Sequence, residues 1–566
     1  MKKLIFLILT LVLVIGTLLV GCGEKETTTA PTTAPTSTTT KVTTTAPPTS
    51  QTTSPPKPTS IPSPTPAAGQ AVYGGILRMI ATSGPQVLSY VGEMGPGDHA
   101  GVFPAAENLV QATAERMSGT GVEPWLCEKV DEDVNNLTMT WHLRKGILFH
   151  DGTEMTAEVV QWNFQLILDA GALPHTDFLK EMKVVDKYTL KMDLNKWSNQ
   201  LMPDWGYWPV ITSKAAYDKA SGGDPKKGKE WQRTNIIGTG PFILKEYKRD
   251  DHITWVKNPN YWIPNKPYLD GIEVMIIPDP VTARAAFEAG EADVWPAPAS
   301  MVAGLEQGGF FRQQSWPALP WGLWINTANP DSKWQDIRLR EALDYALDKA
   351  VIAKAIGFGI YTPLKALPPA GEWGYDPAYD PRPYNPAKAK ELVAAAGFPN
   401  GLKIKLLIMN DPVSQDIGVA VKRYLDDGGF ECELDVADPG RFFGTVYWTP
   451  PSADQDLNWW LAGGMDSNYL QTYMRWFSTT PFTDCSYLGH TEEQKALDAE
   501  AQLIKDVEGQ KAITLKIMKY LADNALIIPV YSTPAYTMQQ PWVHSTMYSQ
   551  GFTRWDTQEV WMEKQK

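Results

Sequence analysis

The segment VDEDVNNLTMTWHLRKGILFHDGTEMTAEVVQWNF, residues 130–164, has the clearest structural pattern in the 566-residue chain. From Leu137 to Arg144 apolar and polar side chains alternate, which is typical of a strand with one buried face. The dipeptides Lys145–Gly146 and Asp151–Gly152 are typical of hairpin turns. Thr156 then stands as an N-cap before apolar positions at helical spacing. The segment therefore predicts a strand pair that leads into an amphipathic helix.

The rest of the chain repeats these elements in other orders. The segment GTGPFILKEYKRDDHITWVKNPNYW (238–262) predicts a second hairpin, and YLDGIEVMIIPDPVTARAAFEAGEADVWP (268–296) predicts a strand, a helix and a strand. The segment DIRLREALDYALDKAVIAKAI (336–356) predicts one continuous amphipathic helix. Residues 386–409 then predict a helix, a glycine stop and a buried strand, and LIIPVYST (526–533) predicts a strand that returns to the first half. The fold class is mixed α/β.

The overall composition excludes several functions. A formal net charge of -13 argues against binding to nucleic acid or to anionic lipid surfaces, because such binding requires basic patches on the protein. The 43% hydrophobic residues are enough for the cores of two or three domains. The seven histidines are scattered without metal-ligand spacing, so we expect no metal and no cofactor.

Four cysteines are too few for a disulfide scaffold. Cys22 stands apart from Cys127, Cys432 and Cys485, which leaves an odd number for pairing. We therefore expect at most one disulfide, involving Cys432 or Cys485, with buried free thiols as the alternative.

The N-terminus indicates secretion. Two lysines precede the mostly apolar run Leu4–Val20, which is the pattern of a signal peptide, with an uncleaved anchor as the alternative. Leu19–Cys22 resembles the bacterial lipobox, in which the cysteine is acylated and becomes the new N-terminus. We expect residues 1–21 to be a lipoprotein signal peptide and Cys22 to be the lipidation site. Residues 22–70 are rich in Thr and Pro and predict a disordered tether.

Five segments, in this order, resemble the family 5 solute-binding proteins of bacterial ABC importers. They are YGGILRM (73–79), residues 130–164, residues 238–262, YLDGIEV (268–274) with AGEADV (289–294), and residues 325–349, and the resemblance extends over residues 72–545. It implies a two-lobed periplasmic-binding-protein-like fold of type II with an extra subdomain, a hinge and an interlobe cleft. By the same resemblance, lobe I would comprise 71–318, lobe II 319–527, and 528–566 would return to lobe I.

The candidate ligand site follows from the resemblance and from the 22 tryptophans. The segment LNWWLAGGMDSNYLQTYM (457–474) resembles the part of the family that lines the cleft in lobe II. Indole faces can stack on sugar rings or apolar side chains, although most tryptophans pack in cores. The candidate ligand residues are Trp448, Trp459, Trp460, Gly463, Gly464, Asp466 and Tyr469.

The chain departs from the peptide-binding members at two places. In those members an aspartate accepts the α-ammonium group of the ligand. This chain has Gly463 and Gly464 near the corresponding position, and Asp466 follows two or three residues later. Asp466 is either a shifted counterpart or a solvated loop acid. The arginine that binds the carboxylate of dipeptides has no counterpart in LIMNDPVSQ (407–415). A dipeptide clamp is therefore not expected, and a larger peptide or an oligosaccharide stays open.

These observations predict a lipid-anchored, extracytoplasmic and monomeric binding component of an ABC importer. Its partners would be the permease and ATPase subunits, and its ligand an oligopeptide, with an oligosaccharide or a nickel complex as alternatives. A ligand-binding sensor would have almost the same sequence. A lipid-anchored hydrolase is disfavoured because no nucleophile–base motif is apparent, so no catalytic residue is assigned.

Overall fold

The computed structural model describes residues 71–94, 98, 101–112, 121–173, 175–448, 451–463, 466, 468–479, 487–544 and 555–563, without the side chains of 315–318 and 448. The described residues belong to one compact unit. The predicted signal peptide and tether, with Cys22, lie outside these residues, as do Gly464 and Cys485.

The segment 130–164 folds as its pattern predicts. Strand β5 (Thr138–Leu143) buries Met139, Trp141 and Leu143 and exposes the side chains between them more. Thr156 caps helix α2 (Ala157–Ala170), since its side chain accepts from the Val159 N–H. The antiparallel sheet that contains β5 has the order β4 (Cys127–Asp133), β5, β7 (Thr189–Leu194) and β6 (Leu179–Asp186).

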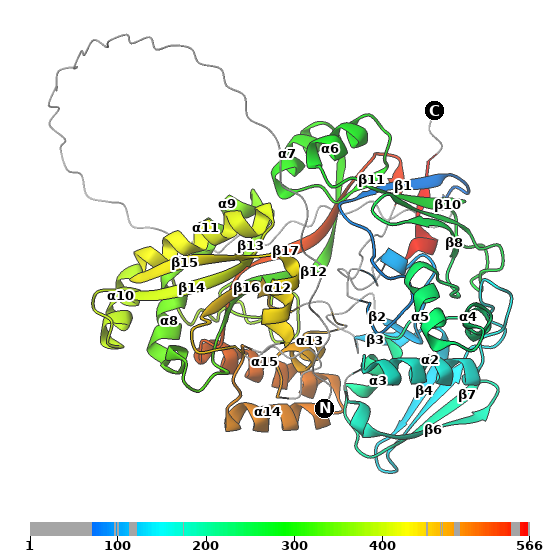
Figure 1. The fold of residues 1–566 in the computed structure, drawn as a ribbon, viewed down its shortest axis with the longest axis horizontal. Helices are drawn as coiled ribbons and strands as arrows, with labels where there is room; N and C mark the ends of the chain where they lie inside the picture. Colours follow the sequence, from blue (N-terminus) through cyan, green and yellow to red (C-terminus); the bar gives the residue numbers. More distant parts are fainter. Residues whose placement is uncertain are drawn as a thin grey trace, which may run out of the picture. The chain divides into compact units, whose positions relative to one another are not determined.

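A larger mixed sheet, with eleven strands among the described residues, runs through the unit (Figure 1). Strand β13 (Thr362–Pro363) pairs with β17 at its side, and the other strands have the order β15 (Phe430–Ala437), β14 (Leu402–Met409), β16 (Leu457–Leu461), β12 (Phe311–Ile325), β17 (Ile527–Gln539), β11 (Val294–Trp295), β1 (Ile76–Ala81), β10 (Gly271–Ile276), β9 (His252–Lys257) and β8 (Phe242–Lys248). The predicted hairpin at 238–262 is strands β8 and β9.

Strands β12 and β17 connect the two halves of this sheet. The first half contains β11, β1, β10, β9 and β8, and the second half contains β16, β14 and β15. They pair antiparallel from Phe311 with Gln539 to Trp324 with Ile527, and β17 also pairs with β11 of the first half. The register shifts between Ser315 and Leu319 and again between Trp321 and Gly322. The predicted return strand is therefore confirmed as β17.

The predicted helix over 336–356 is wrong in one respect, because the structure has two helices there. Helix α8 (Ile337–Ala346) ends before Leu347, whose backbone is extended, and α9 (Lys349–Gly357) begins after it. The Asp348 side chain accepts from the Val351 N–H and caps α9. An aspartate favours a cap over a helix interior, and this local preference overrides the apolar periodicity.

The other helices surround the sheets, and Asp-Pro dipeptides begin several of them with the aspartate as N-cap. They are α3 (Leu201–Gly206), α4 (Lys214–Ser221), α5 (Pro225–Thr234), α6 (Pro280–Glu288), α7 (Ala299–Gln307), α10 (Pro386–Ala395), α11 (Pro412–Asp427), α12 (Pro439–Phe443), α13 (Tyr469–Trp476), α14 (Glu492–Leu503) and α15 (Val507–Asp523). Within the described part of the chain, no helix combines the length and the apolarity that a membrane span needs.

Candidate functional site

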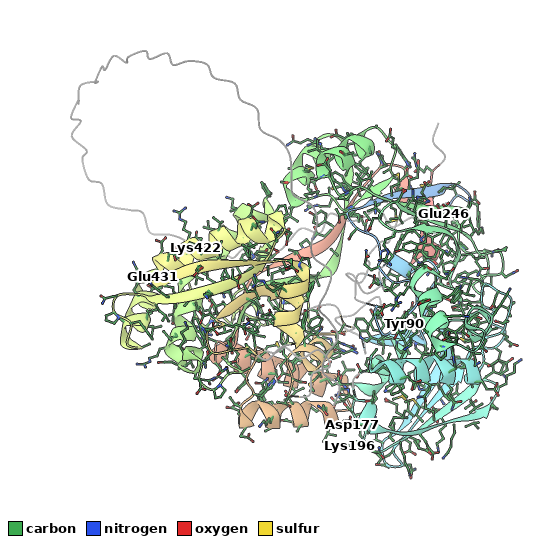
Figure 2. All side chains as sticks on the ribbon, viewed as in Figure 1. Tyr90, Asp177, Lys196, Glu246, Lys422 and Glu431 are labelled. Atoms are coloured by element: carbon green, nitrogen blue, oxygen red, sulfur yellow. The ribbon has the colours of Figure 1, made fainter. Side chains whose placement is uncertain are left out.

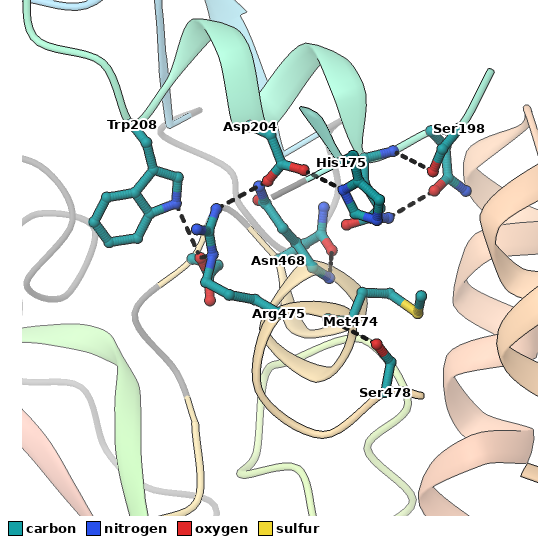
Figure 3. A network of polar contacts seen from close by, with 12 residues as sticks. His175, Ser198, Asp204, Trp208, Asn468, Met474, Arg475 and Ser478 are labelled. Carbon is teal, nitrogen blue, oxygen red and sulfur yellow. Dashed lines mark hydrogen bonds and ion pairs between the residues drawn. The ribbon is translucent and has the colours of Figure 1, made fainter. Parts of the chain in front are cut away.

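A buried cluster of charges joins α3 of the first half to α13 of the second (Figure 3). The Arg475 guanidinium donates from Nε to Asp466 Oδ1 at 2.7 Å and from Nη2 to Asp204 Oδ1 at 2.9 Å. Asn468 caps α13 by accepting from the Gln471 N–H, so the helix that holds Arg475 begins at a defined residue. One arginine thus binds two carboxylates from distant parts of the chain.

Two more side chains complete this cluster. His175 Nδ1 lies 2.9 Å from Asp204 Oδ2, so both oxygens of Asp204 have partners. The Trp208 indole N–H donates to Asp466 Oδ1 at 3.3 Å, and the Arg475 guanidinium lies 4.4 Å from the centroid of the Trp208 ring. Trp208 therefore contacts Asp466 by a hydrogen bond and Arg475 by a cation–π contact.

The charges of the cluster do not balance. Asp466 is 0% exposed, and its Oδ2 has no hydrogen-bond partner among the described residues. His175 Nε2 is also buried without a partner in the described part of the chain. Two carboxylates face one guanidinium, and the surplus negative charge lies at Asp466.

A second contact joins the same two regions. Asn199 Nδ2 donates to the carbonyl oxygens of Ala501 and Ile504, each at 2.8 Å, at the C-terminal end of α14. The Asn199 backbone N–H donates to the Gln502 carbonyl at 3.0 Å. The last carbonyls of a helix lack partners within the helix, so Asn199 caps α14 from outside it.

The two predicted tryptophans of β16 lie on opposite faces. Trp459 is 3% exposed and packs in the core with Leu323, Ile528 and Tyr531, whose ring centroid lies 5.5 Å from that of Trp459. Its burial favours the alternative of core packing over ligand contact. Trp460 is half-buried and packs against the other core of this half.

Trp460 belongs to a group of aromatic side chains. Its ring centroid lies 5.6 Å from that of Trp321 and 5.3 Å from those of Phe442 and Phe443. Its indole N–H donates to the Tyr447 hydroxyl. The Trp448 side chain lies outside the described residues.

Gly463 and Tyr469 have structural roles. Gly463 has φ 103°, and a Cβ there would lie 2.3 Å from Thr472 Cγ2, so no larger residue fits. The Tyr469 hydroxyl donates to the Ala462 carbonyl at 2.7 Å, and the side chain is 0% exposed. This crowding excludes an aspartate side chain at position 463. The next carboxylate along the chain is that of Asp466.

The sequence reasoning did not find Asp204, Arg475, His175 or Asn199. Asp204 stands alone among apolar residues in LMPDWGYW (201–208), and all eight residues of α13, including Arg475, are buried. A lone charge within an apolar and aromatic segment is the signal that was available, because such a charge needs a partner.

A charged groove of about 670 Å³ lies elsewhere, on β14, β15 and α11. Figure 2 labels Lys422 and Glu431 in this region. Lys333 pairs with Asp456 at 2.8 Å, and Lys422 pairs with Asp426 at 2.7 Å. None of the predicted ligand residues lines this groove, so we assign it no ligand.

The thiols and acids of the described residues form no reactive centre. Cys127 and Cys432 are free and buried, which agrees with the alternative of free thiols. Burial raises the pKa of Cys127 to about 11 and that of Cys432 to about 12, so both are protonated at neutral pH. Among the described residues, no group of three or more metal-binding side chains occurs.

Comparison with known proteins assigns the family. The model of the bacterial extracellular solute-binding proteins, family 5 (middle), matches residues 121–484. The chain belongs to this family. The predicted resemblance to family 5 is thereby confirmed, and so is the prediction that the chain is a binding protein and not an enzyme.

Two curated proteins are similar to part of this chain. The chain is 30% identical to heme-binding protein A of Haemophilus influenzae over 51% of its own length and 56% of the relative. It is 28% identical to the dipeptide-binding protein of Escherichia coli over 52% of its length and 58% of the relative. The matched stretch thus spans less than two thirds of either relative.

The structure resembles the ABC transporter-associated periplasmic binding protein DppA of Helicobacter pylori in complex with the peptide STSA, with a TM-score of 0.75. The sequence identity is 22%, and the match covers 87% of this chain and 99% of that one. The predicted two-lobed fold is confirmed. The lobe boundaries at 318 and 527 stay a prediction.

Proposed function

We propose that this family 5 protein captures a peptide for an ABC importer and that Asp466 binds the ammonium group of the peptide. The observation that carries the proposal is Asp466 Oδ2, a buried carboxylate oxygen without a partner among the described residues. A buried carboxylate is stable when a cation or hydrogen-bond donors satisfy it. A peptide ammonium supplies both, whereas an oligosaccharide supplies hydroxyl groups and no charge.

The contacts between the two regions support a closing mechanism. Asp204 and Asn199 come from residues 199–206, in proposed lobe I, while Arg475 and α14 belong to proposed lobe II. A ligand that binds the closed form better than the open form shifts the population toward closure. The permease and ATPase would then receive the ligand from the closed protein.

Binding of two probes tests the proposed ligand. Tetra-alanine has an ammonium group and N-acetyl-tetra-alanine does not, so we expect calorimetry to show binding of the first at least about 100-fold tighter, or about 2.7 kcal/mol. Asp466→Asn should remove most of this preference, and Asp426→Asn, in the charged groove, should keep it. Equal binding of both peptides, or binding of cello-oligosaccharides alone, would contradict the proposal.

We further propose that Cys22 carries lipid and that residues 22–70 tether the lobes to the membrane. The lipobox-like Leu19–Cys22 and the Thr/Pro-rich composition support this. Mass spectrometry of the protein from its membrane should find an N-terminal peptide that begins at Cys22 with acyl chains. An N-terminal peptide that retains Met1–Gly21 would contradict the anchor and leave the binding role intact.

A further inference from the structure

We propose that Asp204 decides which ligands close the two lobes, because it takes part of the Arg475 charge away from Asp466 when the lobes meet. The inference rests on the proposed function, in which the ligand ammonium binds Asp466. It adds Asp204, which binds Arg475 and acts on the proposed ligand position through that arginine.

The hydrogen bonds show how Arg475 is divided. Its Nε binds Asp466 Oδ1 and its Nη2 binds Asp204 Oδ1, so one positive charge serves two carboxylates. Asp204 has a second partner in His175, at 2.9 Å from Oδ2. Asp466 Oδ2 has no hydrogen-bond partner in the part of the chain that the structure describes. The uncompensated charge therefore lies on Asp466 and not on Asp204.

The origin of the three residues makes this arrangement depend on closure. Asp204 lies on α3. Arg475 lies on α13, and Asp466 precedes this helix, nine residues before Arg475 in the sequence. When the lobes separate, Arg475 loses Asp204 and keeps Asp466, so the remaining pair is neutral. When they close, a second carboxylate joins the buried site, where charges interact more strongly than in water.

The arrival of the Asp204 carboxylate favours cationic ligands only when the lobes are closed. A ligand ammonium at Asp466 Oδ2 balances the second carboxylate, so closure buries two positive and two negative charges. An uncharged ligand of the same shape leaves a buried carboxylate without a counter-charge, which is strongly unfavourable. Asp204 thereby couples closure to the charge of the ligand.

Asp204→Asn tests the coupling, since asparagine keeps the shape and an acceptor for Arg475. We expect the wild type to bind tetra-alanine at least about 100-fold more tightly than N-acetyl-tetra-alanine. We expect Asp204→Asn to reduce this ratio to about 10-fold or less, mainly through tighter binding of the acetylated peptide. Asp218→Asn, on the exposed face of α4, is the matched control and should keep the wild-type ratio.

Closure of the wild-type protein gives a second measurement that needs no variant at the site. Solution scattering should show a smaller radius of gyration with saturating tetra-alanine, and the unliganded value with saturating acetylated peptide. An unchanged binding ratio in folded Asp204→Asn, or equal compaction by both peptides, overturns the inference while leaving the proposed function standing. Equal affinity of the wild type for both peptides contradicts the proposed function and removes this inference with it.

Discussion

Trp459 and Trp460 show how neighbouring residues of one type acquire different roles. Successive side chains of a strand point to opposite faces, so Trp459 enters the core against Tyr531 while Trp460 joins the group around Phe442. The sequence alone does not distinguish them, because both are tryptophans and β16 is buried or half-buried along its whole length. The pairing of β16 with β12 and β14 decides which face meets which core.

Trp459→Ala should lower the free energy of unfolding by about 3–5 kcal/mol, since it empties the space of a large buried side chain. Denaturant unfolding of the purified protein measures this difference. Trp460→Ala is the comparison and should have the smaller effect, because Trp460 is half-buried. A loss below about 1.5 kcal/mol at Trp459, with a loss of ligand affinity, would return Trp459 to the ligand site.

His150 should make stability depend on pH. Its Nε2 lies 3.0 Å from the Gly240 carbonyl, its Nδ1 is buried without a partner among the described residues, and burial lowers its pKa. The folded state then binds its proton less readily than the unfolded chain does. The contribution to stability is present above the unfolded pKa of about 6.5 and is lost as the pH falls through it.

We expect the free energy of unfolding of the wild type, relative to His150→Gln, to decrease as the pH falls from 7.5 to 5.5.

His252 gives the opposite case, because the Asp251 carboxylate raises the pKa of His252. Its stabilising contribution is present below the unfolded pKa of about 6.5 and is lost as the pH rises through the raised pKa. The wild type relative to His252→Gln should therefore gain stability over the same fall in pH. Parallel curves for the wild type and His150→Gln would refute the first prediction.

At the scale of elements, local signals predicted most helices and strands. The hairpin predicted at 238–262 forms β8 and β9, and the strand, helix and strand predicted over 268–296 form β10, α6 and β11. The break between α8 and α9 was missed because Leu347 continues the apolar stripe of α8 and is itself buried. Periodicity reports which side chains are buried, but it does not report a cap that interrupts the backbone.

Asp348→Ala should lower the free energy of unfolding by about 1 kcal/mol, because it removes the side-chain acceptor for the Val351 N–H. Asp348→Asn retains an acceptor and should change the stability by a few tenths of a kcal/mol. Thermal unfolding of the three proteins in one buffer compares them. If alanine and asparagine destabilise equally, the cap is not what separates the helices.

At the scale of the whole molecule, the family and the two-lobed fold were predictable from five ordered segments, whereas the charged cluster was not. Asp204 and Arg475 lie 271 positions apart, and no local pattern links them. Asp466 was predicted as a candidate, but its shared arginine depends on how α3 meets α13. Contacts between lobes are set by the packing of complete elements, so segment-by-segment reasoning does not reach them.

Asn199→Ala should weaken ligand binding about 10-fold without touching the ligand position. The variant removes two hydrogen bonds to the end of α14, of about 0.5–1.5 kcal/mol each, and 1.4 kcal/mol corresponds to tenfold. Calorimetry with tetra-alanine measures the change. Asn195→Ala is the matched control, because Asn195 also donates to two carbonyls, of Asp177 and Leu179, within its own region. Equal losses in both variants would refute a role of Asn199 in closure.

The pairing of β12 with β17 sets the order in which the protein can be assembled during synthesis. β12 leaves the ribosome well before β17, yet Trp324 of β12 pairs with Ile527 at the start of β17. Until β17 emerges, one edge of β12 lacks its partner strand, and an open strand edge invites pairing with other chains. The open edge of β12 must therefore be shielded from other chains until most of the polypeptide has been synthesised, a condition that suits recognition by chaperones on the nascent chain.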